Sequence, residues 1–136
     1  MRFIDVGIFL CVAVKEPKEY YEECKKLLKR LKEGKEKVAT SILTPLIFYF
    51  ILENRENLPK AKLTKAMKAL NMLNIEILPL KNENMLEEAS IIAERYNIDL
   101  NDAFNILLME KYEIKEIYAL DKDYDKIKGI RRLIPE

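Results

Sequence analysis

The chain has no histidine among its 136 residues. Histidine is the usual general base near neutral pH and the commonest zinc ligand in proteins. Its absence excludes serine–histidine and cysteine–histidine nucleophilic centres. Any catalytic chemistry in this chain must therefore be carried by carboxylates.

Cysteines are few, and long apolar runs are missing. Cys11 and Cys24 are too few for a disulfide framework, so we expect both to be reduced thiols. The longest apolar stretch, roughly residues 42–52, is too short to span a bilayer. Asp5 and Lys15 break up the first apolar run, so it does not match a signal pattern. These features predict a soluble, cytoplasmic protein.

Positive and negative charges nearly cancel. The chain has 24 Lys and Arg residues against 23 Asp and Glu, which gives a formal net charge of +1. Such a balance provides no strong overall attraction to nucleic acid, so any basic surface must be local. No repeat, low-complexity tract or glycine–serine linker divides the chain. We therefore expect a single domain over residues 1–136.

Apolar patterns predict short strands that alternate with helices. The expected strands are RFID, KVATS, IEILPL, EIYAL and RRLIP. Helices are expected up to Val14 and then over residues 17–31, 42–54, 58–74, 85–96 and 99–112. The segment ILTPLIFYFILEN is apolar almost throughout, which predicts a buried helix. The alternation predicts an α/β sandwich with a parallel sheet.

Four aspartates fall where a parallel α/β fold gathers ligands, outside the carboxyl ends of the strands. Asp5 interrupts the apolar segment RFIDVGIFL, and Asp121 and Asp123 follow EIYAL. Asp102 lies in the first turn of an expected helix, where the helix dipole favours an anion. If the two strands are neighbours, these carboxylates converge and need a cation to stay ionised. Oxygen ligands suit Mg²⁺ or Mn²⁺, so we predict a divalent-metal site.

Each acid also has a simpler structural interpretation. Asp5 alone fits a turn or cap, Asp102 fits the stabilisation of a helix N-terminus, and DKDYD fits a solvated turn. A receiver-like or phosphatase-like domain with Asp5 as phosphoacceptor is a further alternative. That alternative lacks a suitably placed lysine after a late strand. Only the combination of the acids favours the metal site.

Several segments occur in a recognisable order, namely FID, TSILTPLIFYFIL, NDAFNILLMEKYEIKEIYALDKDYD and GIRRLIP. Together they resemble the PIN domain, and most closely the small VapC-like toxins of prokaryotic toxin–antitoxin pairs. The resemblance covers essentially the whole chain and implies a three-layer α/β/α sandwich around a parallel sheet, usually in a dimer. It also implies Mg²⁺- or Mn²⁺-dependent hydrolysis of RNA phosphodiester bonds and a protein antitoxin that plugs the acidic site.

The resemblance assigns roles to the four acids. Asp5 is the first metal ligand, Asp102 is the acid carried by a helix, and Asp121 and Asp123 complete the cluster. All four are thereby predicted to be catalytic and metal-binding. In this chemistry a metal lowers the pKa of a water that attacks phosphorus, and metal charge stabilises the departing oxygen.

Two departures from the family pattern favour an alternative function. Val6 and Gly7 stand where that family has a hydroxylated residue and an asparagine that support the first acid. The family's glutamate falls near Leu46 or Ile47, and the next acid is Glu53, about 10 Å further along the helix. The alternative is a catalytically weakened or inactive PIN-fold module that binds RNA or a protein partner.

A lysine-rich segment is a candidate contact for RNA. Between Leu58 and Ile75 there are four lysines and no acidic residue. Lys62, Lys65 and Lys68 follow helical spacing opposite the apolar stripe, which predicts a ridge that contacts phosphates. A solvated outer face explains the same pattern equally well.

Overall fold

The computed structural model describes all residues of the chain, 1–136, and confirms the predicted alternation of strands and helices. The strands are β1 (Arg2–Ile4), β2 (Val38–Ser41), β3 (Ile75–Leu78), β4 (Glu116–Tyr118) and β5 (Arg131–Leu133). The helices are α1 (Val6–Val14), α2 (Lys18–Lys32), α3 (Leu43–Asn54), α4 (Lys60–Asn71), α5 (Asn84–Tyr96) and α6 (Leu100–Lys111). A 3₁₀ helix, η1 (Lys122–Lys126), precedes β5.

The five strands form one parallel sheet in the order β3-β2-β1-β4-β5. The strand β1 is therefore central, with β2 on one side and β4 on the other. A receiver-like domain has the order 2-1-3-4-5, so the topology excludes the receiver-like alternative. The two strands that precede the predicted acids are neighbours, which is the condition for the acids to converge.

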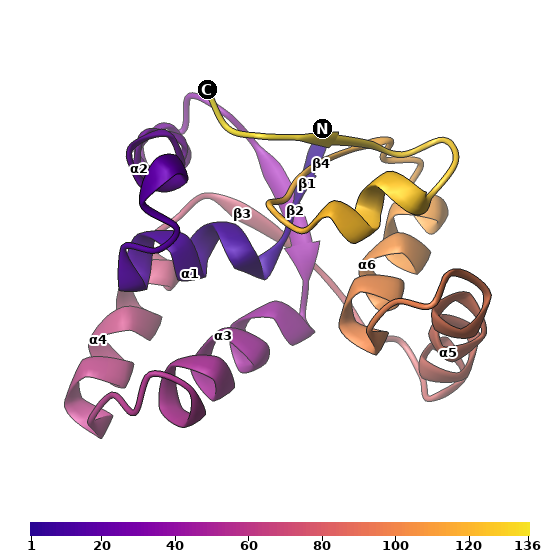
Figure 1. The fold of residues 1–136 in the computed structure, drawn as a ribbon, viewed down its shortest axis with the longest axis horizontal. Helices are drawn as coiled ribbons and strands as arrows, with labels where there is room; N and C mark the ends of the chain where they lie inside the picture. Colours follow the sequence, from indigo (N-terminus) through magenta and orange to yellow (C-terminus); the bar gives the residue numbers. More distant parts are fainter.

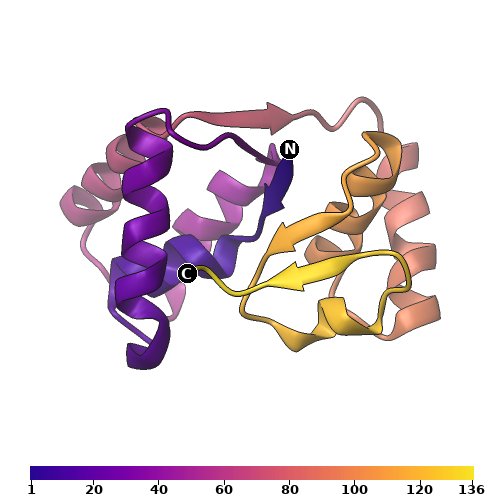
Figure 2. The same ribbon diagram turned by 90° about the horizontal axis from the view of Figure 1, so that it is seen from above.

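Helices cover both faces of the sheet (Figures 1 and 2). The helices α1 to α4 lie on one face, and α5, α6 and η1 lie on the other. Successive strand residues point to opposite faces. Thus Phe3 belongs to the core beneath α5 and α6, whereas Ile4 belongs to the core beneath α1 to α4. This arrangement confirms the predicted three-layer α/β/α sandwich.

The helix α3 is not buried as its composition predicted. Its buried residues are Thr44, Phe48 and Leu52. Leu46 and Phe50 are 66% and 61% exposed, and one turn before Leu46 the N-cap residue Ile42 is also exposed. The helix packs on one side against α1 and α4, so tertiary packing rather than composition decides which face is covered. No helix in the chain has both the length and the apolar character needed to cross a membrane.

Candidate functional site

The candidate site lies at the carboxyl ends of β1 and β4, where the order of the strands in the sheet reverses. The strands β2 and β3 extend from one side of β1, and β4 and β5 lie on its other side. At such a switch point a crevice opens outside the carboxyl ends of the strands. Ile4 pairs with Tyr118, and the Asp5 N–H donates to the Tyr118 carbonyl at 3.0 Å. Asp5, the single residue between β1 and α1, and the loop after β4 therefore begin side by side.

Asp5 is buried between β1 and α1, with 4% of its surface exposed. Its Oδ2 accepts the Gly7 N–H at 3.2 Å, so this side chain caps α1. Its Oδ1 accepts hydrogen bonds from Tyr124 Oη at 2.9 Å and Asn105 Nδ2 at 3.2 Å. The capping interpretation of Asp5 is thus correct, and the second oxygen of the same carboxylate contacts Tyr124 and Asn105.

Asp102 is the third residue of α6 and is equally buried. Its Oδ1 lies 2.9 Å from Tyr124 Oη, so one phenol hydroxyl bridges Asp102 and Asp5. Asp99 occupies the N-cap position of α6, but its side chain makes no capping hydrogen bond. Asp5 and Asp102 therefore lie close together, and only the hydroxyl oxygen of Tyr124 separates their carboxylates.

Asp121 and Asp123 approach Asp102 from the loop after β4. One carboxylate oxygen from each of these three residues lies within 4.8 Å of the other two. Asp121 caps η1 by accepting the Asp123 N–H at 2.8 Å, and the Asp123 carboxylate pairs with Lys126 Nζ at 3.2 Å. Asp5 is outside this group of three and reaches it through Tyr124 and Asp102.

The site places two buried aspartates, Asp5 and Asp102, beside the half-buried Asp123 and the exposed Asp121. Burial raises the pKa of Asp5 against the opposing hydrogen bond from Tyr124. Burial and then the charge of Asp5 raise the pKa of Asp102 to about 7. Burial, followed by the charges of both aspartates, raises the pKa of the Tyr124 hydroxyl well above its usual range. Tyr124 is therefore a neutral phenol between two acids.

The donor set fits a hard divalent cation. The ligand atoms of Asp102, Asp121 and Asp123 are all carboxylate oxygens, which Mg²⁺ and Mn²⁺ prefer. The only ion pair in this group joins Lys126 to Asp123, so Asp102 and Asp121 have no basic side chain to neutralise them. A cation bound here would favour the charged form of Asp102, against the burial and the Asp5 charge that raise its pKa.

No acid from α3 joins the site. Glu53 lies in the last turn of α3 and pairs with Lys60 at the start of α4. Leu46, near the position where a glutamate was expected, is exposed to solvent. The glutamate that the family pattern has near Leu46 is therefore missing from the site, and Glu53 does not replace it.

The predicted RNA-binding lysines lie apart from these acids. Lys62, Lys65 and Lys68 are exposed on α4, which covers the face of the sheet opposite α6 (Figures 1 and 2). Lys62 and Lys65 border a groove between α4 and α2, and none of the four acids lines this groove. Sequence spacing placed them correctly on an outer helical face but carried no information on their distance from the acids.

Two polar residues of the site were missed by sequence reasoning. Asn105 follows Asp102 by three residues and therefore shares its helical face. Tyr124 stands inside DKDYD, which suggested a solvated turn, yet its side chain is fully buried. An amide within the apolar run AFNILLM and an aromatic ring among acids were the available signals.

Comparison with known proteins gives a family and several related structures. A sequence model of the PIN domain matches residues 2–130. The sarcin–ricin-loop-cleaving toxin VapC20 from Mycobacterium tuberculosis has a TM-score of 0.75 and 17% identity, over 99% of this chain and 100% of that chain. A toxin–antitoxin complex from Klebsiella pneumoniae has a TM-score of 0.64 and 15% identity, over 96% and 95% of the respective chains.

A third similar structure is VapBC2 from Rickettsia felis, bound to a DNA fragment from its promoter. Its TM-score is 0.67 at 11% identity, over 99% of this chain and 98% of that chain. None of the curated protein sequences is significantly similar to this chain. At such low identities the structural likeness concerns the fold.

Proposed function

Because the chain belongs to the PIN domain family, as its segment order predicted, we propose that it is a metal-dependent ribonuclease of the toxin–antitoxin type. The observation that carries the proposal is the meeting of Asp102, Asp121 and Asp123 within 4.8 Å at the switch point of the sheet. Asp5 adjoins them through Tyr124. The substrate is RNA, and the bond hydrolysed is a phosphodiester.

The acids of this site have distinct roles in the proposal. Asp102, Asp121 and Asp123 hold Mg²⁺ or Mn²⁺, and Asp5, predicted from the sequence as the first ligand, completes the set from their buried side. When bound, such a cation lowers the pKa of water and offsets charge on the phosphate. In this proposal Lys126, which pairs with Asp123, contacts an RNA phosphate or protonates the leaving oxygen, because the chain has no histidine for that role.

The first test is the metal dependence of RNA cleavage. We expect the purified chain to cleave labelled single-stranded RNA with Mn²⁺ or Mg²⁺ and to lose that activity in excess EDTA, because no basic side chain pairs with Asp102 or Asp121. Readdition of Mn²⁺ should restore the cleavage rate measured on denaturing gels. Equal cleavage in EDTA would contradict the proposal.

An inactive PIN-fold module is the second candidate function. It is favoured by the apolar neighbours of Asp5 and by the pairing of Glu53 with Lys60, which leaves the site without an acid from α3. RNA binding in the same assay, without cleavage at any metal concentration, would favour this alternative. Its binding should weaken as salt increases if lysines contact phosphates.

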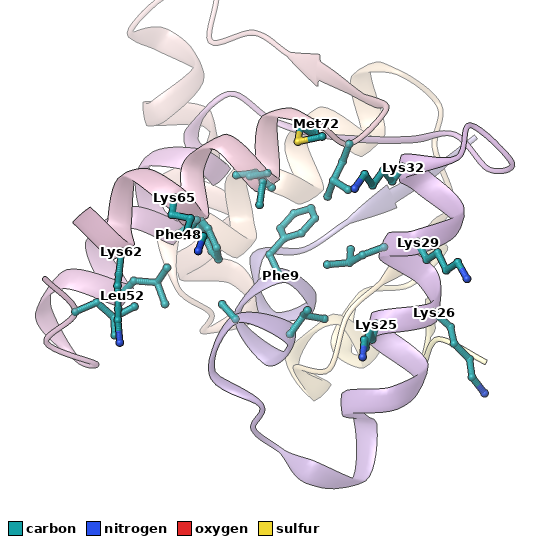
Figure 3. Close-up of a pocket in the computed structure, with 18 of the residues that line it drawn as sticks. Phe9, Lys25, Lys26, Lys29, Lys32, Phe48, Leu52, Lys62, Lys65 and Met72 are labelled. Carbon is teal, nitrogen blue, oxygen red and sulfur yellow. The ribbon is translucent and has the colours of Figure 1, made fainter. Parts of the chain in front are cut away.

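A groove on the face of the sheet that α1 to α4 cover supports an antitoxin partner. It has a volume of about 790 Å³ and lies between α2 and α4, with Phe9 of α1 and Phe48 of α3 among its apolar lining (Figure 3). Most of the lining is apolar, and no acid of the candidate metal site contributes to it, so this surface is additional to the acidic site that the resemblance implies the antitoxin plugs. The six lysines that border it, against one glutamate, are Lys25, Lys26, Lys29, Lys32, Lys62 and Lys65.

The chemistry of this groove fits an amphipathic helix with acidic flanks. Apolar side chains of such a helix fill the floor, while its carboxylates meet the lysines on both rims. RNA fits less well, because an apolar floor offers nothing to a phosphate backbone. We therefore assign Lys62 and Lys65 to partner binding in this proposal. The direct RNA contacts predicted for Lys62, Lys65 and Lys68 are the competing outcome.

A charge placed in the groove tests the partner proposal. Ala69 lines the groove and Ala61 does not, although both are exposed on α4. We expect Ala69→Glu to weaken binding of a designed amphipathic helical peptide with acidic flanks by about tenfold or more, because it places a charge against an apolar surface. Ala61→Glu should leave the Kd unchanged in calorimetry.

Either of two results would contradict the partner proposal. The first is an equal Kd for the two alanine variants. The second is a loss of RNA binding in Lys62→Glu/Lys65→Glu while the affinity for the partner is unchanged. That result would show that these lysines contact RNA rather than the partner.

The exposed face of α3 supports the predicted homodimer. Ile42, Leu46 and Phe50 recur at four-residue intervals and present one apolar strip to solvent. We expect light scattering to give the mass of a dimer for the wild type and of a monomer for Phe50→Glu. A wild-type mass equal to the chain's 16.0 kDa would contradict this prediction.

A further inference from the structure

The hydroxyl of Tyr124 occupies a fully buried position among polar groups of the candidate site. Its oxygen lies 2.9 Å from Asp5 Oδ1, 2.9 Å from Asp102 Oδ1 and 2.9 Å from Asn105 Nδ2. The Tyr124 side chain has no exposed surface. Burying a hydroxyl costs free energy unless it is hydrogen-bonded, and here all of its partners belong to this one site.

The N–H groups of Asn105 and the O–H group of Tyr124 determine which hydrogen bonds hold the two carboxylates. The Asn105 amide has two N–H donors, one directed at Tyr124 Oη and one at Asp5 Oδ1. The single phenol proton goes to Asp5 or to Asp102 at any moment. Asp5 Oδ1 is thus held by α6 and η1, while its Oδ2 is held by the Gly7 N–H.

The first turn of α1, directly after Asp5, cannot supply this support with side chains of its own. Val6 has no polar atoms beyond its backbone, and Gly7 has no side chain. A Cβ at Gly7 would lie 3.2 Å from Asp5 Oδ2, which is tighter than normal van der Waals contact. The carboxylate therefore uses the Gly7 backbone N–H on one side and distant side chains on the other.

Core packing explains the aromatic ring of Tyr124 but not its buried hydroxyl. The Tyr124 ring belongs to the apolar core beneath α5 and α6, where a phenylalanine ring fills the same space. The hydroxyl adds only contacts to Asp5, Asp102 and Asn105. The hydroxyl of Tyr118, by contrast, contacts Arg2 and Glu36 near the amino ends of the strands.

We propose that Tyr124 and Asn105 are positioning residues that fix Asp5 and Asp102 for a divalent cation, replacing the support that Val6 and Gly7 do not provide. The inference rests on the proposed function and adds to it the means by which its first acid is oriented. Such outer contacts set the direction of a ligand's lone pairs, and their removal typically costs 10–100-fold in metal affinity.

The test measures Mn²⁺ affinity rather than activity. Free Mn²⁺ is followed by its paramagnetic resonance signal during titration of wild type, Tyr124→Phe, Asn105→Leu and the matched control Tyr118→Phe. We expect the Kd to rise about 10–100-fold in the first two variants and to stay within about twofold in the control. Circular dichroism confirms that each variant is folded at the temperature of the titration.

A double variant separates positioning from a general structural role. If Tyr124 acts through Asp5, Tyr124→Phe should add little to the loss of Mn²⁺ affinity already caused by Asp5→Asn. A purely structural tyrosine would lower the melting temperature and leave the Kd at 25 °C unchanged.

Two results overturn the inference and are distinguishable. Wild type and Tyr124→Phe with equal Mn²⁺ affinity, or tighter binding in the variant, would remove the positioning role and leave the proposed function standing. No Mn²⁺ binding by the wild type would remove the metal-dependent function together with the inference.

Discussion

Replacement of Asp102 by asparagine should reduce metal-dependent RNA cleavage by about 10³-fold, the equivalent of several kcal/mol of charge stabilisation. Asp102 is the one acid that belongs to both parts of the site. It lies within 4.8 Å of Asp121 and Asp123, and it shares the hydroxyl of Tyr124 with Asp5. Its loss removes a carboxylate ligand while keeping nearly the same volume in α6.

The rate is measured in a single turnover with labelled RNA and saturating Mn²⁺. Asp99→Asn is the matched control, because Asp99 stands at the start of the same helix and its side chain makes no capping hydrogen bond. This control should cleave RNA at the wild-type rate. Equal residual cleavage by wild type and Asp102→Asn would identify the activity as a contaminant and would refute the proposed function.

The metal-free protein should lose stability as the pH rises from about 4 to about 7. Asp102 has its pKa raised from 3.8 to about 7 by burial and by the charge of Asp5. Between these two values the folded chain binds more protons than the unfolded chain, so the free energy of unfolding falls with increasing pH. The full effect of this one group is at most about 4 kcal/mol.

Other titrating groups do not reverse this trend. The pKa of Asp5 is also raised, chiefly by burial, so Asp5 contributes in the same direction. The pKa values of Glu33 and Asp125 are lowered by their partners Lys35 and Arg132, so their stabilising effect is lost only at lower pH. The slope between pH 5 and 7 therefore reports mainly on the two buried aspartates.

Urea unfolding in EDTA at several pH values measures this slope. We expect Asp102→Asn to flatten it and to unfold at higher urea concentration than the wild type at pH 8, because a buried charge has been removed. Mn²⁺ should stabilise the wild type at pH 8 by mass action, and the variant much less. An unchanged slope in Asp102→Asn would contradict the assignment of the titrating group.

The sequence by itself determined the elements and the place of each acid along them. Apolar segments such as RFID and EIYAL and the helical spacing around Leu27 and Leu31 are local patterns, so they predicted the strands and helices that the structure contains. Asp5, Asp121 and Asp123 were found because they directly follow predicted strands. Their meeting depended on β1 and β4 being neighbours, a condition that the sequence left open and the topology confirms.

Only the tertiary structure decided which surfaces are covered and what surrounds the acids. The apolar helix α3 leaves Leu46 and Phe50 in solvent, and Lys62 and Lys65 border a groove among α1 to α4 that none of the acids lines. Tyr124 was hidden in a segment whose composition is typical of a solvated turn, yet η1 folds its ring into the core.

The physical reason for this division is the range of the interactions. Propensity and periodicity act over a few neighbouring residues, whereas burial depends on segments that are distant in sequence.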